Sequence, residues 1–298
     1  MNRFHLAGLL AVLVLSAPTW VDAAEISTAR GPVDVPASPA PIAVYDVAAI
    51  DTLSALGVVP EGVPDKLYLP SLDGIAAAAV PVGTLFEPDL EALSRLAPAL
   101  IIAGGRSAAQ VEALSQVAPT IDMTIGPDLI GDARARLAAY GTLFDKAEAA
   151  AALDAALTAK LAEARAAAAG KGRALIVLTN GPKVSAYGRG SRFGWIHDAL
   201  DLAEARPHLE AATHGDAISF EFIAEVNPDW LIVVDRGAAV GASGQAALAT
   251  LDNPLVAGTT AWRKGQVIAI DPARVYVAGG GYRSVMATLD ELIAAFRG

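Results

Sequence analysis

The chain has 298 residues, of which 54% are hydrophobic, with no cysteine and a formal net charge of -10. This length suits one large domain or two ordinary ones, the lack of cysteine excludes disulfides and a cysteine nucleophile, and the negative charge argues against nucleic acid or an anionic membrane as partner. An anionic ligand would therefore require positive charge gathered locally.

The amino terminus has the anatomy of a secretory signal peptide. Positive charge in residues 1–5 precedes an apolar block over 6–18 and small residues that end at Ala23. The apolar block has about 13 residues, whereas a membrane-spanning helix needs about 20. We expect a signal peptide over 1–23, cleavage after Ala23 or Ala24, and release into a bacterial periplasm without lipidation, because no cysteine is present to carry a lipid.

The next segment predicts the start of an α/β lobe. Residues 25–41 are rich in proline and glycine and predict an extended lead-in or a small hairpin, residues 42–45 a buried strand, and residues 46–56 a helix that ends at Gly57. Residues 58–83 mix short apolar runs with prolines, which is typical of loops that face a cleft.

A cassette of helix, proline, strand and arginine occurs twice with the same spacing. The equivalent positions are Glu91, Pro98 and Arg106 in the first copy and Glu221, Pro228 and Arg236 in the second. In each copy the proline ends a short amphipathic helix, and the arginine follows the carboxyl end of an apolar strand, where open α/β sheets bind ligands. The repeat predicts two similar lobes that share a cleft, although helix-proline-strand is also common in unrelated α/β proteins.

The longest helical pattern runs over about 132–169, with a possible break near Gly141. It is rich in alanine and contains no proline, so its helix propensity is high. We interpret it as a rigid connection between an N-terminal lobe over 24–140 and a C-terminal lobe over 171–298, the connecting helix being residues 141–170. An ordinary surface helix of a single domain is the alternative.

The C-terminal part again predicts alternating strands and helices. Strands are expected at 173–178, 184–187 and 267–270, with helices from Trp195 and over 284–297. The alternation indicates an α/β fold with parallel sheets and right-handed crossovers. The turn over 188–194 is not a dinucleotide motif, because its third glycine, Gly194, comes one position late, and the simpler interpretation is a glycine turn that projects Arg192.

Several side chains are candidates for ligand chemistry. No GxSxG or HExxH motif is present, so no catalytic residue is predicted. His214 lies in a polar loop and Tyr276 precedes a glycine turn; taken alone, the first is usually solvated and the second usually packed. Arg106, Arg192 and Arg236 each follow a predicted strand or strand-turn. If these arginines converge, they repel one another, and a multiply anionic ligand is needed to offset that repulsion. The alternative is that all three are exposed arginines on solvated loops.

Five short segments carry a resemblance to a known family: SRFG at 191–194, THG at 213–215, VVDR at 233–236, LDNPLV at 251–256 and DPARVY at 271–276. On these residues, and over 42–298 as a whole, the chain resembles the periplasmic substrate-binding proteins of iron-siderophore ABC importers. Within them it is similar to the group that binds ferric catecholates such as enterobactin fragments and petrobactin. The resemblance implies two Rossmann-like lobes joined by one long rigid helix, the helical-backbone type of periplasmic binding protein.

The resemblance also implies roles for individual residues. Matching arginines surround the anionic chelate, here Arg106, Arg192 and Arg236, while His214 and Tyr276 complete the coordination of iron when the siderophore supplies only four donors. Iron(III) is a hard cation that favours oxygen ligands such as a phenolate and accepts an imidazole. Glu91 and Glu221 match the pair that docks onto the permease. The loop over 278–281 is more glycine-rich than the family pattern.

The expected function is capture of a ferric siderophore, of tetradentate catecholate type, by a monomer that delivers it to an inner-membrane ABC permease. Iron(III) arrives as the chelate, and no intrinsic cofactor is expected. A heme-binding periplasmic protein is the first alternative, because tyrosine and histidine also ligate heme, although three arginines favour a more compact polyanion than heme with its two propionates. A periplasmic α/β enzyme that acts on a polyanionic substrate is the second.

Overall fold

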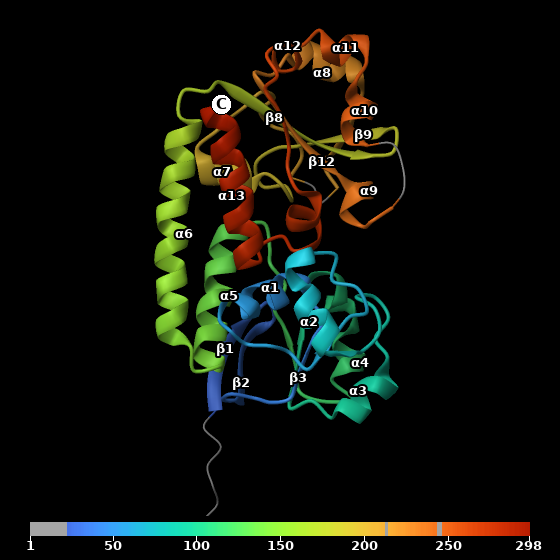
Figure 1. The fold of residues 1–298 in the computed structure, drawn as a ribbon, viewed down its shortest axis with the longest axis vertical. Coiled ribbons are helices and arrows are strands. Elements are labelled where there is room, and N and C mark those ends of the chain that lie inside the picture. Colours follow the sequence, from blue (N-terminus) through green and yellow to red (C-terminus); the bar gives the residue numbers. More distant parts are fainter. Residues whose placement is uncertain (1–22, 212–213, 243–245) are drawn as a thin grey trace, which may run out of the picture.

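The computed structural model describes residues 23–211, 214–242 and 246–298. The expected signal peptide, except for Ala23, lies outside the described residues. Thr213 of the THG segment also lies outside them. No helix within the described ranges combines the length and apolarity that crossing a membrane requires. Apart from a two-stranded hairpin, the described residues form two sheets with surrounding helices, one in the lower and one in the upper half of Figure 1.

The N-terminal sheet is entirely parallel, with strand order β5-β4-β3-β6-β7. Its strands are short and carry apolar residues: β3 (Ile42–Val44), β4 (Gly62–Val63), β5 (Val80–Pro81), β6 (Leu100–Ala103) and β7 (Thr120–Asp122). All residues of the central strands β3 and β6 are buried, which is typical of a parallel sheet covered on both faces. An antiparallel hairpin of β1 (Ala23–Thr28) and β2 (Gly31–Pro36) precedes it, as expected for the lead-in.

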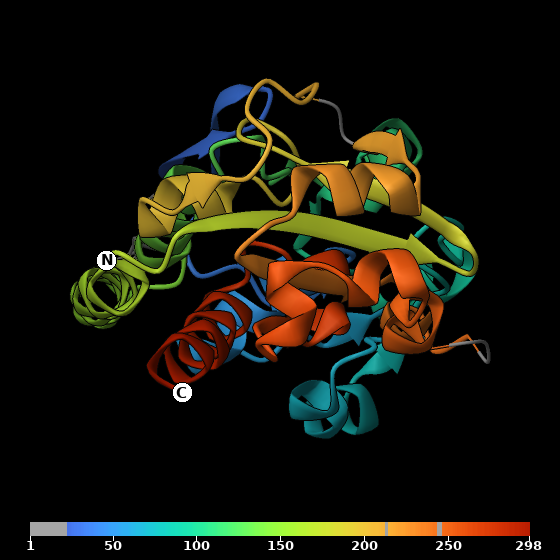
Figure 2. The ribbon, with the colours of Figure 1, turned by 90° about the horizontal axis from the view of Figure 1, so that it is seen from above.

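The C-terminal sheet is mixed, with order β11-β9-β8-β12-β13 and β10 beside β8. Its strands are β8 (Arg173–Asn180), β9 (Lys183–Tyr187), β10 (Ala203–Glu204), β11 (Asp216–Ile218), β12 (Trp230–Asp235) and β13 (Val267–Ala269). Helices lie on both sides of β8 (Figure 2). The α/β class is confirmed, but β8 and β9 form an antiparallel hairpin rather than a crossover. Only residues 181–182 separate them, and Gly181 has φ +58°, a turn conformation that favours glycine.

Both cassettes have the predicted local structure. The helix α3 (Leu90–Leu96) begins after the cap Asp89, and α8 (Phe220–Val226) begins after the cap Ser219. Each helix ends on a residue in the left-handed region, Ala97 with φ 48° and Asn227 with φ 44°. A proline and a central strand follow in each copy, β6 in the first and β12 in the second. The repeat is therefore confirmed as local structure.

The long helical pattern forms two helices, α5 (Leu129–Leu143) and α6 (Ala147–Ala168). The break lies at 144–146, where Asp145 has φ 53°, and not near Gly141. Gly141 lies within α5, and its lack of a side chain lets the two helices approach closely. A Cβ atom on Gly141 would lie 2.6 Å from Cβ of Ala150. In Figure 1, α6 runs along one side of the molecule beside both halves.

The C-terminal helix α13 (Tyr282–Arg297) also holds the two halves together, because it packs on α6 and on α1 (Val47–Ala55). Thr52 and Asp51 of α1 accept hydrogen bonds from the backbone of α13. Oγ1 of Thr52 receives the N–H of Tyr282 at 3.1 Å, and Oδ2 of Asp51 that of Ser284 at 3.0 Å. The amino terminus of α13 is thus capped by side chains from the other half of the molecule.

The remaining elements are short helices around the sheets. They are η1 (Pro70–Leu72), α2 (Asp73–Ala78), η2 (Gly105–Gln110), α4 (Val111–Leu114), α7 (Trp195–Leu200), α9 (Arg236–Ala239), α10 (Ala247–Leu251), α11 (Pro254–Ala257), α12 (Thr260–Arg263) and η3 (Ala273–Val277). The segment η3 is a single turn of π-helix, and it carries Tyr276.

Candidate functional site

Two adjoining cavities share Arg192 and Tyr276 in their linings; the larger lies between the halves of the molecule, and the smaller is lined by residues of the C-terminal half. The larger has a volume of about 530 Å³ and is also lined by Arg106. The smaller has a volume of about 190 Å³ and is also lined by His214 and Arg236. Together they fall in the size range of small-molecule sites, which is roughly 300–1,000 Å³. The five residues predicted to bind ligand or metal therefore line one continuous region.

Tyr276 is the centre of this region, since its ring is half-buried and packs against the apolar cores of both halves. Its carbonyl oxygen accepts hydrogen bonds from Nη2 of Arg106 at 2.7 Å and from Nη2 of Arg192 at 2.6 Å. Its hydroxyl accepts one from Nε of Arg236 at 3.1 Å. The sequence left two interpretations of Tyr276 open, a packed aromatic residue and a residue of the ligand site. In the structure the ring packs against both cores and also lines both cavities.

The three guanidinium groups also lie near the face of the Tyr276 ring. Their Cζ atoms are 4.2 Å from the ring centroid for Arg192, 5.1 Å for Arg106 and 5.9 Å for Arg236. Such placements are favourable cation-π contacts. Among the described residues, none of the three forms an ion pair with a carboxylate. The cluster therefore keeps a net positive charge.

This charge changes the acidity of the groups in the cluster. Burial raises the pKa of the Tyr276 hydroxyl, but the hydrogen bond from Arg236 and the charges of Arg192, Arg236 and Arg106 outweigh it and leave the pKa below its ordinary value. Burial, together with the neighbouring charge of Arg106, lowers the pKa of Arg192. A phenol held this way loses its proton more readily, which favours binding to a hard cation.

His214 is exposed and lies in the loop before β11. Its carbonyl oxygen accepts a hydrogen bond from the Tyr187 hydroxyl at 2.9 Å, which fixes the backbone beside the smaller cavity. Within the described residues, no group of three or more histidine, cysteine or acidic side chains could hold a metal ion.

Glu91 and Glu221 lie away from the cavities. Both are exposed and occupy the same place in their helices, in the first turn after the cap. Glu91 forms an ion pair with Arg95, one helical turn further along α3. The helices α3 and α8 are at opposite ends of the molecule in Figure 1, so the two carboxylates belong to different halves.

Sequence reasoning missed several residues that line the larger cavity. Asp46 had been assigned only to the start of a helix, and it does cap α1, accepting a hydrogen bond from the N–H of Ala48 at 3.2 Å. Burial raises its pKa to about 6, against the opposing effects of that hydrogen bond and the charge of Arg106. Its position directly after a buried strand was the available signal. Phe86, Ile125 and Leu129 form an apolar part of the same lining, and no motif marks them.

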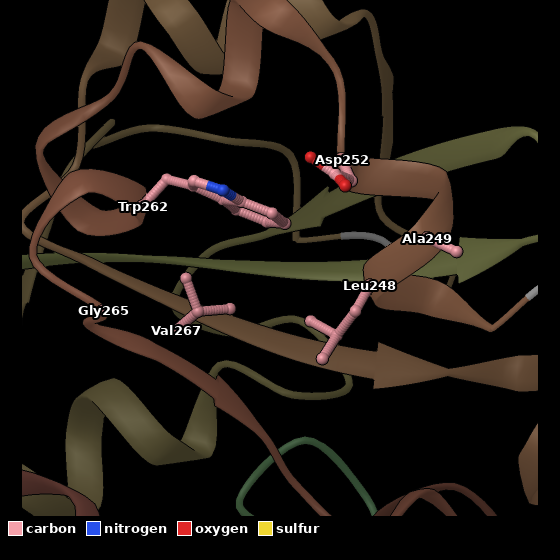
Figure 3. Close-up of a pocket in the computed structure, with 6 residues that line it drawn as sticks. All are labelled: Leu248, Ala249, Asp252, Trp262, Gly265 and Val267. Atoms are coloured by element: carbon pink, nitrogen blue, oxygen red, sulfur yellow. The ribbon is translucent and has the colours of Figure 1, made fainter.

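A further cavity of about 360 Å³ lies on the outer side of the C-terminal sheet, between α10, α12 and β13 (Figure 3). Leu248, Trp262 and Val267 line it, and Asp252 is the one charged side chain among the described residues that do. An apolar recess with a carboxylate does not attract an anion. The cavities around Tyr276 are therefore the better candidate for an anion site.

Known proteins share the sequence pattern and the fold of this chain. Residues 42–273 match the family model described as "Periplasmic binding protein". Petrobactin-binding protein YclQ of Bacillus subtilis is 32% identical over 265 residues, 87% of this chain and 83% of that protein. Its crystal structure superposes with a TM-score of 0.88 at 29% identity and covers 93% of this chain and 99% of that chain.

Two other solved structures have a similar fold. The siderophore-binding protein BauB, bound to two molecules of acinetobactin and ferric iron, has a TM-score of 0.83 at 28% identity, with 92% of this chain and 99% of that chain covered. The periplasmic catecholate-siderophore binding protein VctP of Vibrio cholerae has a TM-score of 0.82 at 27% identity, with coverage of 93% and 99%.

Proposed function

The chain belongs to the periplasmic binding protein family, and on this premise we propose that it captures a ferric siderophore in the cleft around Tyr276 and delivers it to an ABC permease. The observation that carries the proposal is the convergence of Arg106, Arg192 and Arg236 on one tyrosine. The similarity to proteins named for binding petrobactin and catecholate siderophores supports a catecholate as the ligand.

The proposed binding mode follows from the charges of the site. A ferric bis-catecholate keeps net negative charge, which the three guanidinium groups neutralise by charge-assisted hydrogen bonds to the catecholate oxygens. When the chelate supplies only four donors, the Tyr276 phenolate and the His214 imidazole fill the two remaining positions on iron. The lowered pKa of Tyr276 supports this role, because coordination requires the phenol to lose its proton.

We infer binding without turnover. The site offers cations, a phenol, an imidazole and the carboxyl of Asp46, and the family is one of binding proteins. The division into lobes over 24–140 and 171–298 with a connection over 141–170 belongs to the same proposal. Its support is the pair of separate sheets with α6 beside both.

The test is a titration of the purified protein with ferric chelates, followed by tryptophan quenching and visible absorption. We expect saturable binding of a ferric bis-catecholate with a broad charge-transfer band in the visible region. A sharp Soret band on addition of heme, with no response to the catecholate, would instead favour heme. Release of a chemically altered chelate would favour an enzyme.

A further inference from the structure

Phe86 lies at the edge of the larger cavity, in the turn before α3. Its side chain is 57% exposed, and it lines the same cavity as Arg106, Arg192 and Tyr276. A single exposed aromatic residue is common on protein surfaces and means little by itself. Its position beside the cationic cluster is what distinguishes Phe86 from other exposed apolar residues.

The backbone that presents Phe86 is held in place before any ligand arrives. Oγ1 of Thr84 accepts hydrogen bonds from the N–H of Phe86 at 3.2 Å and from that of Glu87 at 2.9 Å. Gly83 pairs with Pro88 across the turn and has φ +94°. A Cβ atom on Gly83 would lie 2.4 Å from the backbone nitrogen of Asp89, so only glycine fits there. A fixed turn lowers the entropy cost of using the ring for binding.

The larger cavity has an apolar part in addition to its cationic one. Ile125, Pro127 and Leu129 line it together with Phe86, and Leu129 is buried. The backbone at Gly280 packs closely against this wall, since a Cβ atom there would lie 2.4 Å from Cδ1 of Ile125. A small hydrophilic chelate held by the arginines would leave these apolar side chains uncovered.

We propose that Phe86 is a specificity-determining residue that contacts an aromatic ring carried on the scaffold of the ferric chelate. The inference rests on the proposed function and adds to it: the arginines and Tyr276 hold the iron centre, and the apolar wall with Phe86 selects the organic part of the ligand. Contact between two aromatic rings covers apolar surface and adds a preferred edge or offset-stacked geometry.

The experiment compares two synthetic ferric bis-catecholates with the same four donor atoms, one with a phenyl ring on its linker and one without. Each is titrated into the wild-type protein, Phe86→Ala, Phe86→Tyr and the control Leu255→Ala, which removes a similarly exposed apolar side chain on α11. We expect the wild type, Phe86→Tyr and the control to bind the phenyl-bearing chelate about three- to tenfold more tightly than the other. Phe86→Ala should bind both equally.

A phenyl preference that survives Phe86→Ala, with circular dichroism showing a folded variant, overturns the inference while the proposed function stands. Unchanged affinities combined with loss of uptake would assign Phe86 to a contact with the permease, which also overturns it. If the wild type binds neither chelate, the proposed function itself fails and the inference falls with it.

Discussion

The carbonyl oxygen of Tyr276 receives two guanidinium groups, one from Arg106 after β6 and one from Arg192 after β9. A carbonyl has two lone pairs, so both are in use. A neutral acceptor takes one hydrogen bond from each of the two cations but does not cancel their charge. The remaining charge is available to an anionic ligand, and it acts in a partly desolvated cleft where electrostatic interactions are stronger than in water.

Replacing Tyr276 with phenylalanine separates coordination from packing. Tyr276→Phe removes the hydroxyl but keeps the ring beside Arg192 and the backbone carbonyl. We expect a tetradentate ferric catecholate to bind more than roughly tenfold more weakly, because iron loses a donor, and a hexadentate one to bind within about twofold of the wild type. Titration with both chelates measures this, with Tyr68→Phe as the control outside the cavities. Equal losses for the two chelates would argue against direct coordination.

We expect Asp46 to make the affinity for an anionic ligand depend on pH. With its pKa raised to about 6, the carboxyl is mostly ionised at pH 7.5 and mostly protonated at pH 5, so its repulsion of an anionic ligand appears only at the higher pH. We expect Asp46→Asn, which retains a helix cap, to bind ferric catecholate like the wild type at pH 5 and roughly fivefold more tightly at pH 7.5. The ratio of the two dissociation constants is the quantity to measure, since catecholate protonation cancels in it. A ratio that does not change with pH would rule this effect out.

Among the helices, the packing of α13 on α1 places an ionisable side chain between the two halves. Asp51 is fully buried, and Oδ1 of Asp51 and the hydroxyl of Ser284 have no hydrogen-bond partner within the described residues. Burial raises the pKa of Asp51 to about 6, although the backbone N–H groups of α13 oppose that effect. Ionised Asp51 is therefore disfavoured by the fold relative to the unfolded chain.

The consequence for stability has a definite sign. Well below its ordinary pKa of 3.8, Asp51 is protonated in both states, and as the pH rises from there to about 6 the unfolded state releases its proton first, so the wild type loses stability. Relative to Asp51→Asn, the free energy of unfolding of the wild type should fall by roughly 2 kcal/mol between pH 4 and 7. Urea denaturation of both proteins across this range measures the difference. A constant difference would show that the pKa of Asp51 is not raised.

Elements differed in how far the sequence predicted them. The carboxyl ends of α3 and α8 were predicted from the prolines that follow them, Pro98 and Pro228, because this signal is local. The break between α5 and α6 was misplaced, because the role of Gly141 depends on its contact with Ala150, which no local pattern reveals. The β8–β9 hairpin was missed for a related reason: pairing direction depends on where the chain goes after Gly181.

For the whole molecule, the proposed docking residues offer a test that does not depend on affinity. Replacing both Glu91 and Glu221 with alanine removes one exposed carboxylate from each half. We expect iron uptake through the cognate permease to be lost while the dissociation constant for the ferric chelate is unchanged, because neither residue lines the cavities. The matched control is Glu112→Ala with Glu225→Ala, the same change of charge on α4 and α8. Normal uptake by the Glu91 and Glu221 variant would reject the docking role.

The arrangement of the two halves was predicted in outline from the repeated cassette and the α/β alternation. Arg106 and Arg236 were found through their equal spacing, and Arg192 through its glycine turn. Asp46 and Phe86 were not identified from the sequence, because a carboxylate after a strand and an aromatic residue in a turn are both common in sites that bind nothing. Their relevance comes from the cavity that distant segments form together, and that information is tertiary.

The three guanidinium groups belong to a chain whose formal net charge is -10. An approaching anion is therefore repelled at long range and attracted only once it enters the cleft. Dissolved ions shorten the reach of the repulsion to about 8 Å at physiological ionic strength, while the contacts inside the cleft are screened much less. Diffusional encounter should thus become faster as salt is added up to that level. The residence time of the bound ferric chelate should change far less with salt concentration.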